Sequence, residues 1–150
     1  MGIRPTFDRR ELDRYLRNGV EAELHKRVLR NLNALGMQCV TLARSLDTYK
    51  DRTGNLRNSI GYLIQKDGVV IDSFFQAVGG GTLGKDTGET YAKDVGKNYP
   101  NGYALIVVAG MEYAGYVEHV HDLPVLQPAK DFAEAKAPEI IERIKNLQVR

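Results

Sequence analysis

The chain has 150 residues, of which 43% are hydrophobic and 27% are charged, and its formal net charge is +2. These values indicate a globular domain rather than a disordered chain, and no apolar run approaches the ~18 residues that would span a bilayer. The single cysteine, Cys39, excludes an intramolecular disulfide and any zinc site built on two thiolates. The first residues are charged and form no apolar signal segment, so we expect synthesis in the cytoplasm and no membrane partner.

The charge is unevenly distributed along the chain. Residues 1–66 carry 13 Lys/Arg against 7 Asp/Glu, whereas residues 67–150 carry 8 against 12. A basic half of this kind is compatible with nucleic-acid binding. A basic half joined to an acidic half is equally compatible with head-to-tail pairing between copies, or with two solvated faces of opposite sign.

The amino-terminal third is expected to be helical. Residues 8–17 suit a short helix, within an amino-terminal arm that ends near residue 18. A second, longer helix follows, because apolar residues recur at steps of three or four over about seven turns. They are Val20, Leu24, Val28, Leu32, Leu35, Cys39, Leu42 and Leu46. Cys39 lies on this stripe and is expected to be a small buried hydrophobe, whereas His25 lies between stripe positions and is expected to be solvated.

The middle of the chain has the pattern of strands and turns. Leu56 and Ile60 are four residues apart and suggest one further helical turn. Residues 61–75 predict a β-hairpin that turns at Asp67-Gly68. Residues 79–102 contain seven glycines and no apolar period, which predicts a long flexible loop. Residues 103–110 are apolar enough to form a central strand.

The remaining elements complete an α+β pattern. Residues 111–120 have helical spacing. Residues 122–129, DLPVLQPA, are expected to be extended because each of their two prolines disfavours the α conformation in the preceding residue, and a final helix begins at about Ala129. Pro138 is expected to kink or restart that helix. We therefore predict one domain over residues 1–150, with a long amino-terminal helix and a carboxy-terminal helix packed on a small antiparallel sheet.

Residues 79–88, GGGTLGKDTG, match the start of a nucleotide phosphate loop. Such a loop reads G-x-x-x-x-G-K-[ST], and Gly79, Gly84 and Lys85 occupy its first three fixed positions. The hydroxyl that would bind magnesium is replaced by Asp86, and the residues after Lys85 show no apolar stripe from which a helix would be expected. We therefore interpret this stretch as a flexible excursion and expect no nucleotide cofactor.

No other motif predicts catalysis. His119 and His121 would share one face of a strand and could bind a metal there, but the sequence locates no third or fourth ligand. The alternative is a pair of half-exposed histidines at a turn. No serine, cysteine or lysine lies in a recognisable nucleophile motif, so we expect no enzymatic activity. The tyrosines of residues 91–116 could stack on bases, although without interleaved basic residues a protein interface is favoured.

Two motifs together resemble a known family. Residues 51–60, DRTGNLRNSI, are similar to the T-G-x-L-[RK]-x-S-I signature that follows the long first helix of head–tail joining proteins of tailed bacteriophages. Residues 113–118, YAGYVE, resemble the Y-A-x-Y-V-E of the same family, and residues 125–129, VLQPA, resemble its F-L-x-P-A. The order and spacing agree over roughly residues 20–147. The family usually has Gly-Thr after the glutamate and a basic approach to the last helix, where this chain has His119–Pro124.

The resemblance implies a structural, non-enzymatic virion protein, also called a tail-completion, neck or minor capsid protein. Such proteins assemble as rings, often hexameric, at the junction of capsid and tail. Their partners are copies of themselves, a connector or adaptor ring, tail proteins, and DNA that passes through the channel without sequence specificity. The alternative is a nucleic-acid-binding module that uses the basic amino-terminal half.

The motif residues are candidates for fold-determining or interface roles. Thr53 and Gly54 would turn the chain off the long helix, and Leu56 and Ile60 would anchor that turn. Tyr113 and Tyr116 would pack a short helix on the sheet, which would leave Glu118 free for a neighbouring subunit. The remaining motif candidates are Arg57, Ser59, Leu126 and Pro128.

Overall fold

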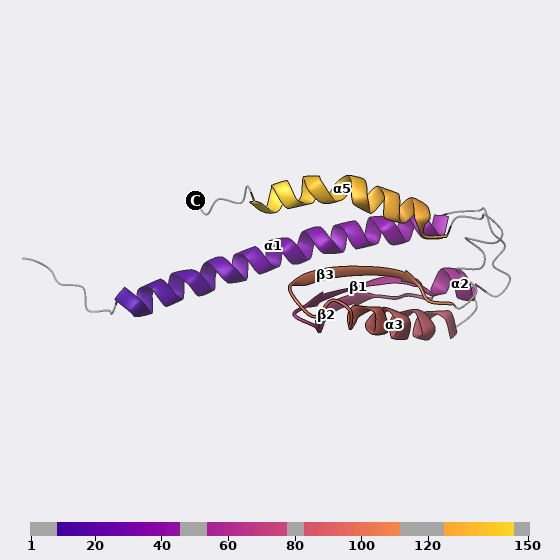
Figure 1. Ribbon diagram of the computed structural model, residues 1–150, viewed down its shortest axis with the longest axis horizontal. Helices are drawn as coiled ribbons and strands as arrows, with labels where there is room; N and C mark the ends of the chain where they lie inside the picture. The colour runs from indigo at the N-terminus through magenta and orange to yellow at the C-terminus, as the bar shows by residue number, and fades with distance from the viewer. Residues whose placement is uncertain (1–8, 46–53, 78–82, 112–124, 146–150) are drawn as a thin grey trace, which may run out of the picture.

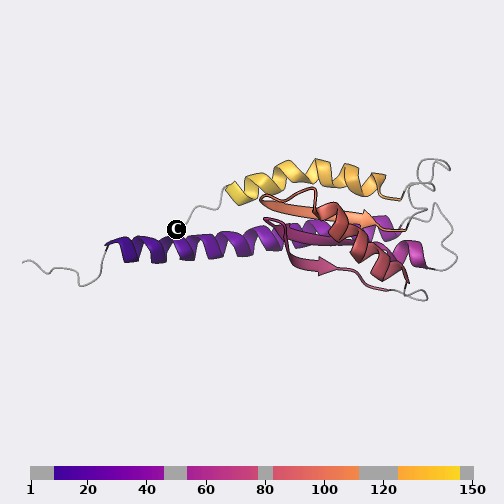
Figure 2. The ribbon, with the colours of Figure 1, turned by 60° about the horizontal axis from the view of Figure 1, so that its bottom comes forward.

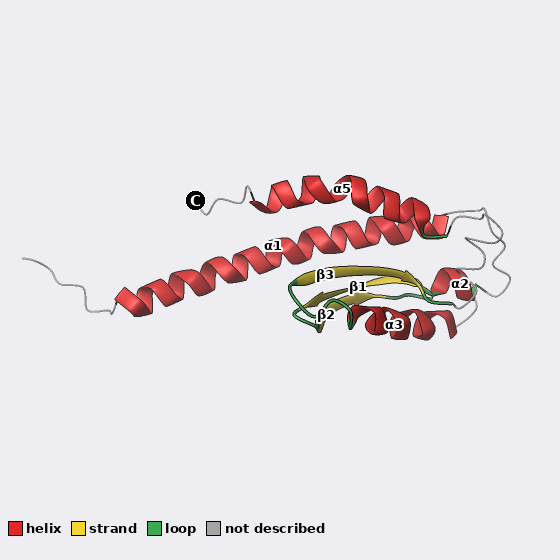
Figure 3. Ribbon diagram, in the orientation of Figure 1, coloured by secondary structure: helices red, strands yellow, loops and turns green. Residues whose placement is uncertain are grey.

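The computed structural model describes residues 9–45, 54–77, 83–111 and 125–145. A three-stranded antiparallel sheet forms the middle layer, with two helices, α1 (Arg9–Ser45) and α5 (Gln127–Lys145), on one face and α3 (Leu83–Gly96) on the other (Figures 1 and 3). The predicted α+β fold is confirmed. A single turn, α2 (Asn55–Asn58), leads into the sheet.

Helix α1 is one continuous element of 37 residues, roughly 55 Å long at ~1.5 Å per residue. The prediction of a separate short helix over residues 8–17 is therefore wrong for its described part. The helix passes through Gly19, where beyond the adjoining backbone of the helix itself nothing described lies within 4 Å of the position a Cβ would take. A single glycine costs a helix only about 1 kcal/mol relative to alanine, which is too little to break a helix of this length.

The sheet has the strand order β2-β1-β3, with β1 (Ile60–Lys66) in the centre. It is paired with β2 (Val69–Phe74) through the predicted two-residue turn, in which Asp67 and Gly68 have φ of 51° and 81°. Positive φ at both positions suits the right-handed twist of a hairpin. The other neighbour, β3 (Tyr103–Ala109), lies at an edge, so its predicted central position is wrong. Its apolar sequence is explained by helices on both faces.

The face of the sheet beneath α1 and α5 carries the larger core. Ile60, Tyr62 and Ile64 alternate toward it from β1 and pack with Leu35 and Cys39 of α1. The chain approaches closely at Gly36, where a Cβ would come within 2.7 Å of the Tyr62 ring. The Tyr62 hydroxyl donates a hydrogen bond to Asn33 Oδ1 on α1 at 2.8 Å.

The opposite face is covered by α3, in the segment where the sequence predicts a loop. That prediction is wrong over residues 83–96. Small residues at steps of four, Gly84, Gly88, Ala92 and Gly96, are all buried. A Cβ at Gly84 or Gly88 would overlap the backbone carbonyl oxygen of Asn55 or Ser59. The glycines therefore let the helix lie directly on the backbone beneath it, and this packing offsets their low helix propensity.

Helix α5 begins at Gln127 and runs antiparallel to α1 along its carboxy-terminal half (Figure 1). It continues through Pro138, so the predicted restart at that residue does not occur. Gln65 links two layers from the sheet: its buried amide donates hydrogen bonds to the carbonyls of Gly96 and Tyr99, both at 2.7 Å. Gly96 is the last residue of α3, where the carbonyls have no donor within the helix, and Tyr99 lies in the turn that follows.

Candidate assembly surfaces

The first resembled motif forms the turn between α1 and the sheet. Thr53 lies outside the described residues, and Gly54 has φ 74°, a left-handed conformation, directly before α2. Leu56 and Ile60 are 1% and 0% exposed, and both belong to the larger core. The Ser59 hydroxyl donates to the Leu56 carbonyl at 2.7 Å. The structure therefore places these motif residues in packing rather than on a surface.

Arg57 is half-buried beside them. In the third motif, Leu126 is half-buried against the core and Pro128 is the second residue of α5. The first turn of a helix accepts proline because its backbone N–H groups have no partner within the helix. The second motif, with Tyr113, Tyr116 and Glu118, lies outside the described residues, as do His119 and His121.

The described residues contain no group of three or more His, Cys, Asp or Glu that could hold a metal ion. Burial raises the pKa of the Cys39 thiol, which is opposite to the change that activates a nucleophilic cysteine. The thiol lies 3.7 Å from the Ala129 carbonyl oxygen, toward which it is directed as a donor. Cys39 therefore has the environment of a buried structural residue.

The phosphate-loop match lies at the amino-terminal end of α3. A helix does begin there, at Leu83, so the expectation that no helix follows this stretch is wrong. Asp86 still stands where a phosphate loop has its magnesium-binding Ser or Thr. Lys85 and Asp86 are exposed in the first turn of the helix. Gly84 serves packing, because it is pressed against Asn55, whose side chain accepts a hydrogen bond from the Gly84 backbone N–H at 3.2 Å.

The amino-terminal part of α1 projects beyond the rest of the molecule (Figures 1 and 2). We call residues 9–24 the α1 overhang. Every side chain that the structure describes between Arg10 and Leu24 is exposed, including Val20 at 41% and Leu24 at 43%. The apolar stripe enters the core only from Val28 onward. The first two residues of the predicted stripe therefore lie on the helix but outside the core of the subunit.

The body of the molecule begins at His25. This residue was expected to be solvated, but it is half-buried and its Nδ1 is hydrogen-bonded to the hydroxyl of Tyr103, at the start of β3. Lys66 lies over the same tyrosine ring, with its Nζ 5.2 Å from the ring centroid. This cluster fixes α1 to the end of the sheet and marks the point at which the overhang begins.

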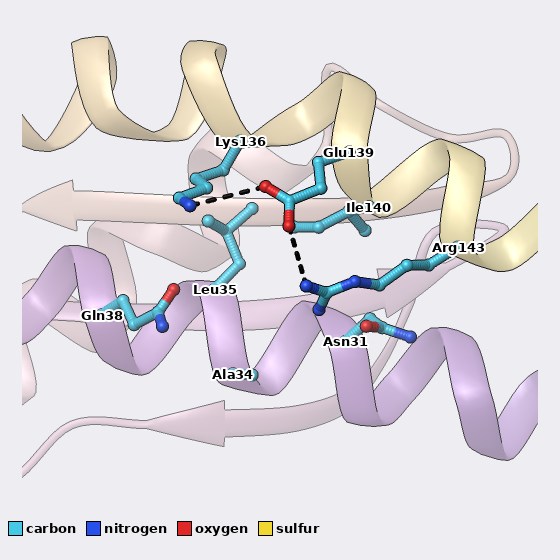
Figure 4. A pocket seen from close by; sticks show the side chains of 8 residues that line it. All are labelled: Asn31, Ala34, Leu35, Gln38, Lys136, Glu139, Ile140 and Arg143. Atoms are coloured by element: carbon cyan, nitrogen blue, oxygen red, sulfur yellow. Dashed lines mark hydrogen bonds and ion pairs between the residues drawn. The ribbon is translucent and has the colours of Figure 1, made fainter.

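A shallow groove of about 100 Å³ separates α1 from α5 (Figure 4). Glu139 bridges Lys136 at 3.4 Å and Arg143 at 2.8 Å along its α5 side, while Asn31 and Gln38 border it from α1. Both ion pairs are about half exposed, so each contributes little to stability. The groove is small and polar, and its charged groups are already paired, so it does not resemble a ligand pocket.

A larger and more apolar groove of about 310 Å³ lies between α5 and β3. Leu105 and Val107 of β3 form one side, Ala129 and Ala133 of α5 form the other, and Cys39 contributes from α1. A second, more open groove of about 660 Å³ runs along α3 beside Gly110, the residue after β3, and is bordered by Thr87 and Tyr91. Sequence analysis missed both grooves, because they depend on the position of β3 in the sheet.

No family model, curated protein or solved structure matches the chain. Among the described residues, no helix combines the length and apolar character needed to cross a membrane.

Proposed function

We propose that this protein is a structural subunit of the head–tail junction of a tailed bacteriophage or prophage, and that it acts without catalysis. Copies would assemble as a ring, of six subunits if it follows the resembled family. Connector or adaptor proteins would lie on one side of the ring and tail proteins on the other. DNA would pass through the central channel without sequence-specific contacts. The site of action would be the virion, after synthesis in the bacterial cytoplasm.

The α1 overhang is the observation that carries this proposal. Its 16 residues extend roughly 24 Å at ~1.5 Å per residue, and an isolated helix of this length is only marginally stable in water. It nevertheless exposes Val20 and Leu24, which precede Val28 on the same four-residue spacing. An apolar ridge that continues from the core onto an uncovered helix is well suited to burial against another protein.

The direction of the overhang supports a role in joining two components of an assembly. α1 runs roughly along the strands and leaves the body at one end (Figure 1). If the strands of a ring stand along its axis, the overhangs project from one rim. They would then meet the next component of the junction, while the sheets and their helices form the ring itself.

The ordered set of resembled motifs supports the same proposal. Its first member coincides with the turn that follows the long helix, at Gly54 and α2, and its last member coincides with the start of α5. These two positions, after the long first helix and at the start of the last helix, support the proposal.

A complementation assay tests the role of the overhang. Val20→Lys/Leu24→Lys should fold normally, because both side chains are already exposed in the subunit, but heads and tails should remain unjoined when this variant replaces the natural protein. Met37→Lys is the matched control. Met37 is 40% exposed on the same helix but lies beside the body, so this variant should join heads to tails normally. Equal joining by both variants would contradict the proposed role.

The alternative function is nucleic-acid binding by the basic amino-terminal half, and DNA-binding measurements distinguish it from the structural role. On the overhang, Arg10, Arg14 and Arg17 alternate with Glu11, Asp13 and Glu21, which weakens any continuous basic surface. If the protein nevertheless binds duplex DNA with an affinity that falls steeply as salt rises, and heads join to tails without it, the nucleic-acid function replaces the structural one.

A further inference from the structure

The two edges of the sheet are different from each other, and within the described residues neither has a further strand paired to it. The β2 edge carries one charged residue, Asp72, whose carboxylate is turned toward α1 and accepts a hydrogen bond from Asn33 Nδ2 at 2.9 Å. The β3 edge has no charged residue in seven. Uncharged, regular edge strands readily accept another strand unless something covers them.

The β3 edge is also flanked by a groove on each face. The apolar groove beside Leu105 and Val107 lies toward α5, whereas the more open groove follows α3, reaches the sheet at Gly110 and is lined largely by charged and polar side chains of α3. Successive side chains of a strand point to opposite faces. A strand added beside β3 would therefore direct alternate side chains into the two grooves, and α5 and α3 would partly cover it.

The chain itself carries a strand that fits this place. β2 is the least buried strand, and its exposed apolar residues are Val69, at 65%, and Val70, at 40%. Val69 pairs with Lys66 and Val70 with Gln65 on β1, so they face opposite sides of the sheet. In the subunit α3 lies over β1 and β3. Beside the β3 edge of another copy, Val69 would face the apolar α5 groove, and Val70 would lie on the α3 side of the sheet.

We infer that β2 of one copy pairs with β3 of the next copy, so that the sheets of the ring form one continuous intersubunit sheet. Both strands are antiparallel to β1, so they are parallel to each other, and this pairing keeps all copies in the same sense. Because the contact joins two different surfaces, it repeats from copy to copy and closes a ring if the rotation allows. The inference rests on the proposed function only in taking a ring as the product.

The strand ends give an expected alignment. Val69 and Tyr103 both pair with Lys66, so the starts of β2 and β3 lie at the same height in the sheet. Closed sheets stagger their strands, so the exact register between copies is left open. A test must therefore tolerate a shift of a few residues.

Cysteine cross-linking tests the pairing directly. Ser73→Cys places a thiol on β2 and Ala104→Cys places one on β3, on the face toward α3. Each single variant is treated alone and in an equal mixture with a short bifunctional maleimide, at the highest soluble concentration. The natural protein is the control, because Cys39 is buried. We expect covalent dimers only in the mixture, and the double variant should give a ladder that stops at the number of subunits in the ring.

Several results would overturn the inference. Dimers from Ala104→Cys alone would indicate β3 pairing with β3 about a two-fold axis, and no dimers in the mixture would exclude β2–β3 contact. A second measurement uses Val69→Lys/Val70→Lys, which should leave the unfolding midpoint unchanged because both side chains are exposed, while abolishing oligomers in sedimentation. Oligomers of unchanged size would contradict the pairing.

These outcomes separate the pairing from the proposed function. If the lysine variant on β2 still forms rings that join heads to tails, the strand pairing is wrong and the head–tail role stands. If β2–β3 dimers form but heads and tails join without the protein, the pairing stands and the head–tail role is wrong.

Discussion

Gly88→Ala is the substitution that most sharply tests the packing of α3. In an exposed helix, replacing glycine with alanine stabilises by about 1 kcal/mol. At Gly88 the added Cβ would overlap the Ser59 carbonyl oxygen and lie 2.9 Å from its carbonyl carbon, whereas ordinary contact begins at 3.4 Å. The obstruction is the backbone of the residue directly before β1, so the helix itself must move.

Overpacking of this kind typically costs 1–3 kcal/mol or more, and a backbone obstruction belongs at the upper end. After the gain in helix propensity is subtracted, we expect a net loss of about 2 kcal/mol in the free energy of unfolding. In a domain of this size that corresponds to a melting temperature roughly 4–8 °C lower. Urea unfolding followed by circular dichroism measures the change.

Gly19→Ala is the matched control for this experiment. It makes the same chemical change within a helix, but beyond the adjoining backbone of its own helix nothing described lies within 4 Å of its Cβ position. The variant should be as stable as the natural protein or more stable by up to about 1 kcal/mol. If Gly88→Ala were also neutral or stabilising, α3 would not be packed on the sheet backbone, and residues 83–96 would behave as the loop that the sequence pattern suggests.

Three further predictions concern individual side chains. Gly54→Ala should lower the free energy of unfolding by about 1–2 kcal/mol in urea, because φ 74° is unfavourable for alanine. Gln65→Met should cost about 1–3 kcal/mol by the same measurement, since it removes two side-chain hydrogen bonds, to the Gly96 and Tyr99 carbonyls, each worth about 0.5–1.5 kcal/mol. Burial, and secondarily the charge of Asp72, raises the pKa of Tyr62. The folded state therefore favours the neutral phenol, and stability should fall as the pH rises above the ordinary tyrosine value of ~10; Tyr62→Phe should reduce that fall in pH-dependent unfolding.

The sequence predicts well those features that depend on short-range chemistry. The Asp67-Gly68 turn follows from the backbone freedom of its residues, and the buried part of α1 follows from the apolar spacing that runs through Val28, Leu35 and Cys39. The same spacing cannot distinguish a ridge buried in its own subunit from one left for a partner. Val20 and Leu24 continue the spacing of the buried residues, yet both are exposed.

The missed helix has a physical explanation. Periodicity analysis looks for large apolar side chains, whereas α3 packs through Gly84, Gly88 and Gly96, which have none. The spacing of four between these small residues was the available signal. The strand order could not be predicted from the sequence either, because β3 has the composition of a central strand although it lies at the edge. Both grooves beside β3, and the surface they form, depend on that order.

Deletion of the gene from the phage or prophage that carries it tests the central claim most directly. Lysates would be examined by electron microscopy, with and without the protein supplied from a plasmid. The account predicts that heads and tails accumulate separately in the deletion strain and that the supplied protein restores joined virions. Intact, infectious virions in the deletion strain would contradict the proposed head–tail function.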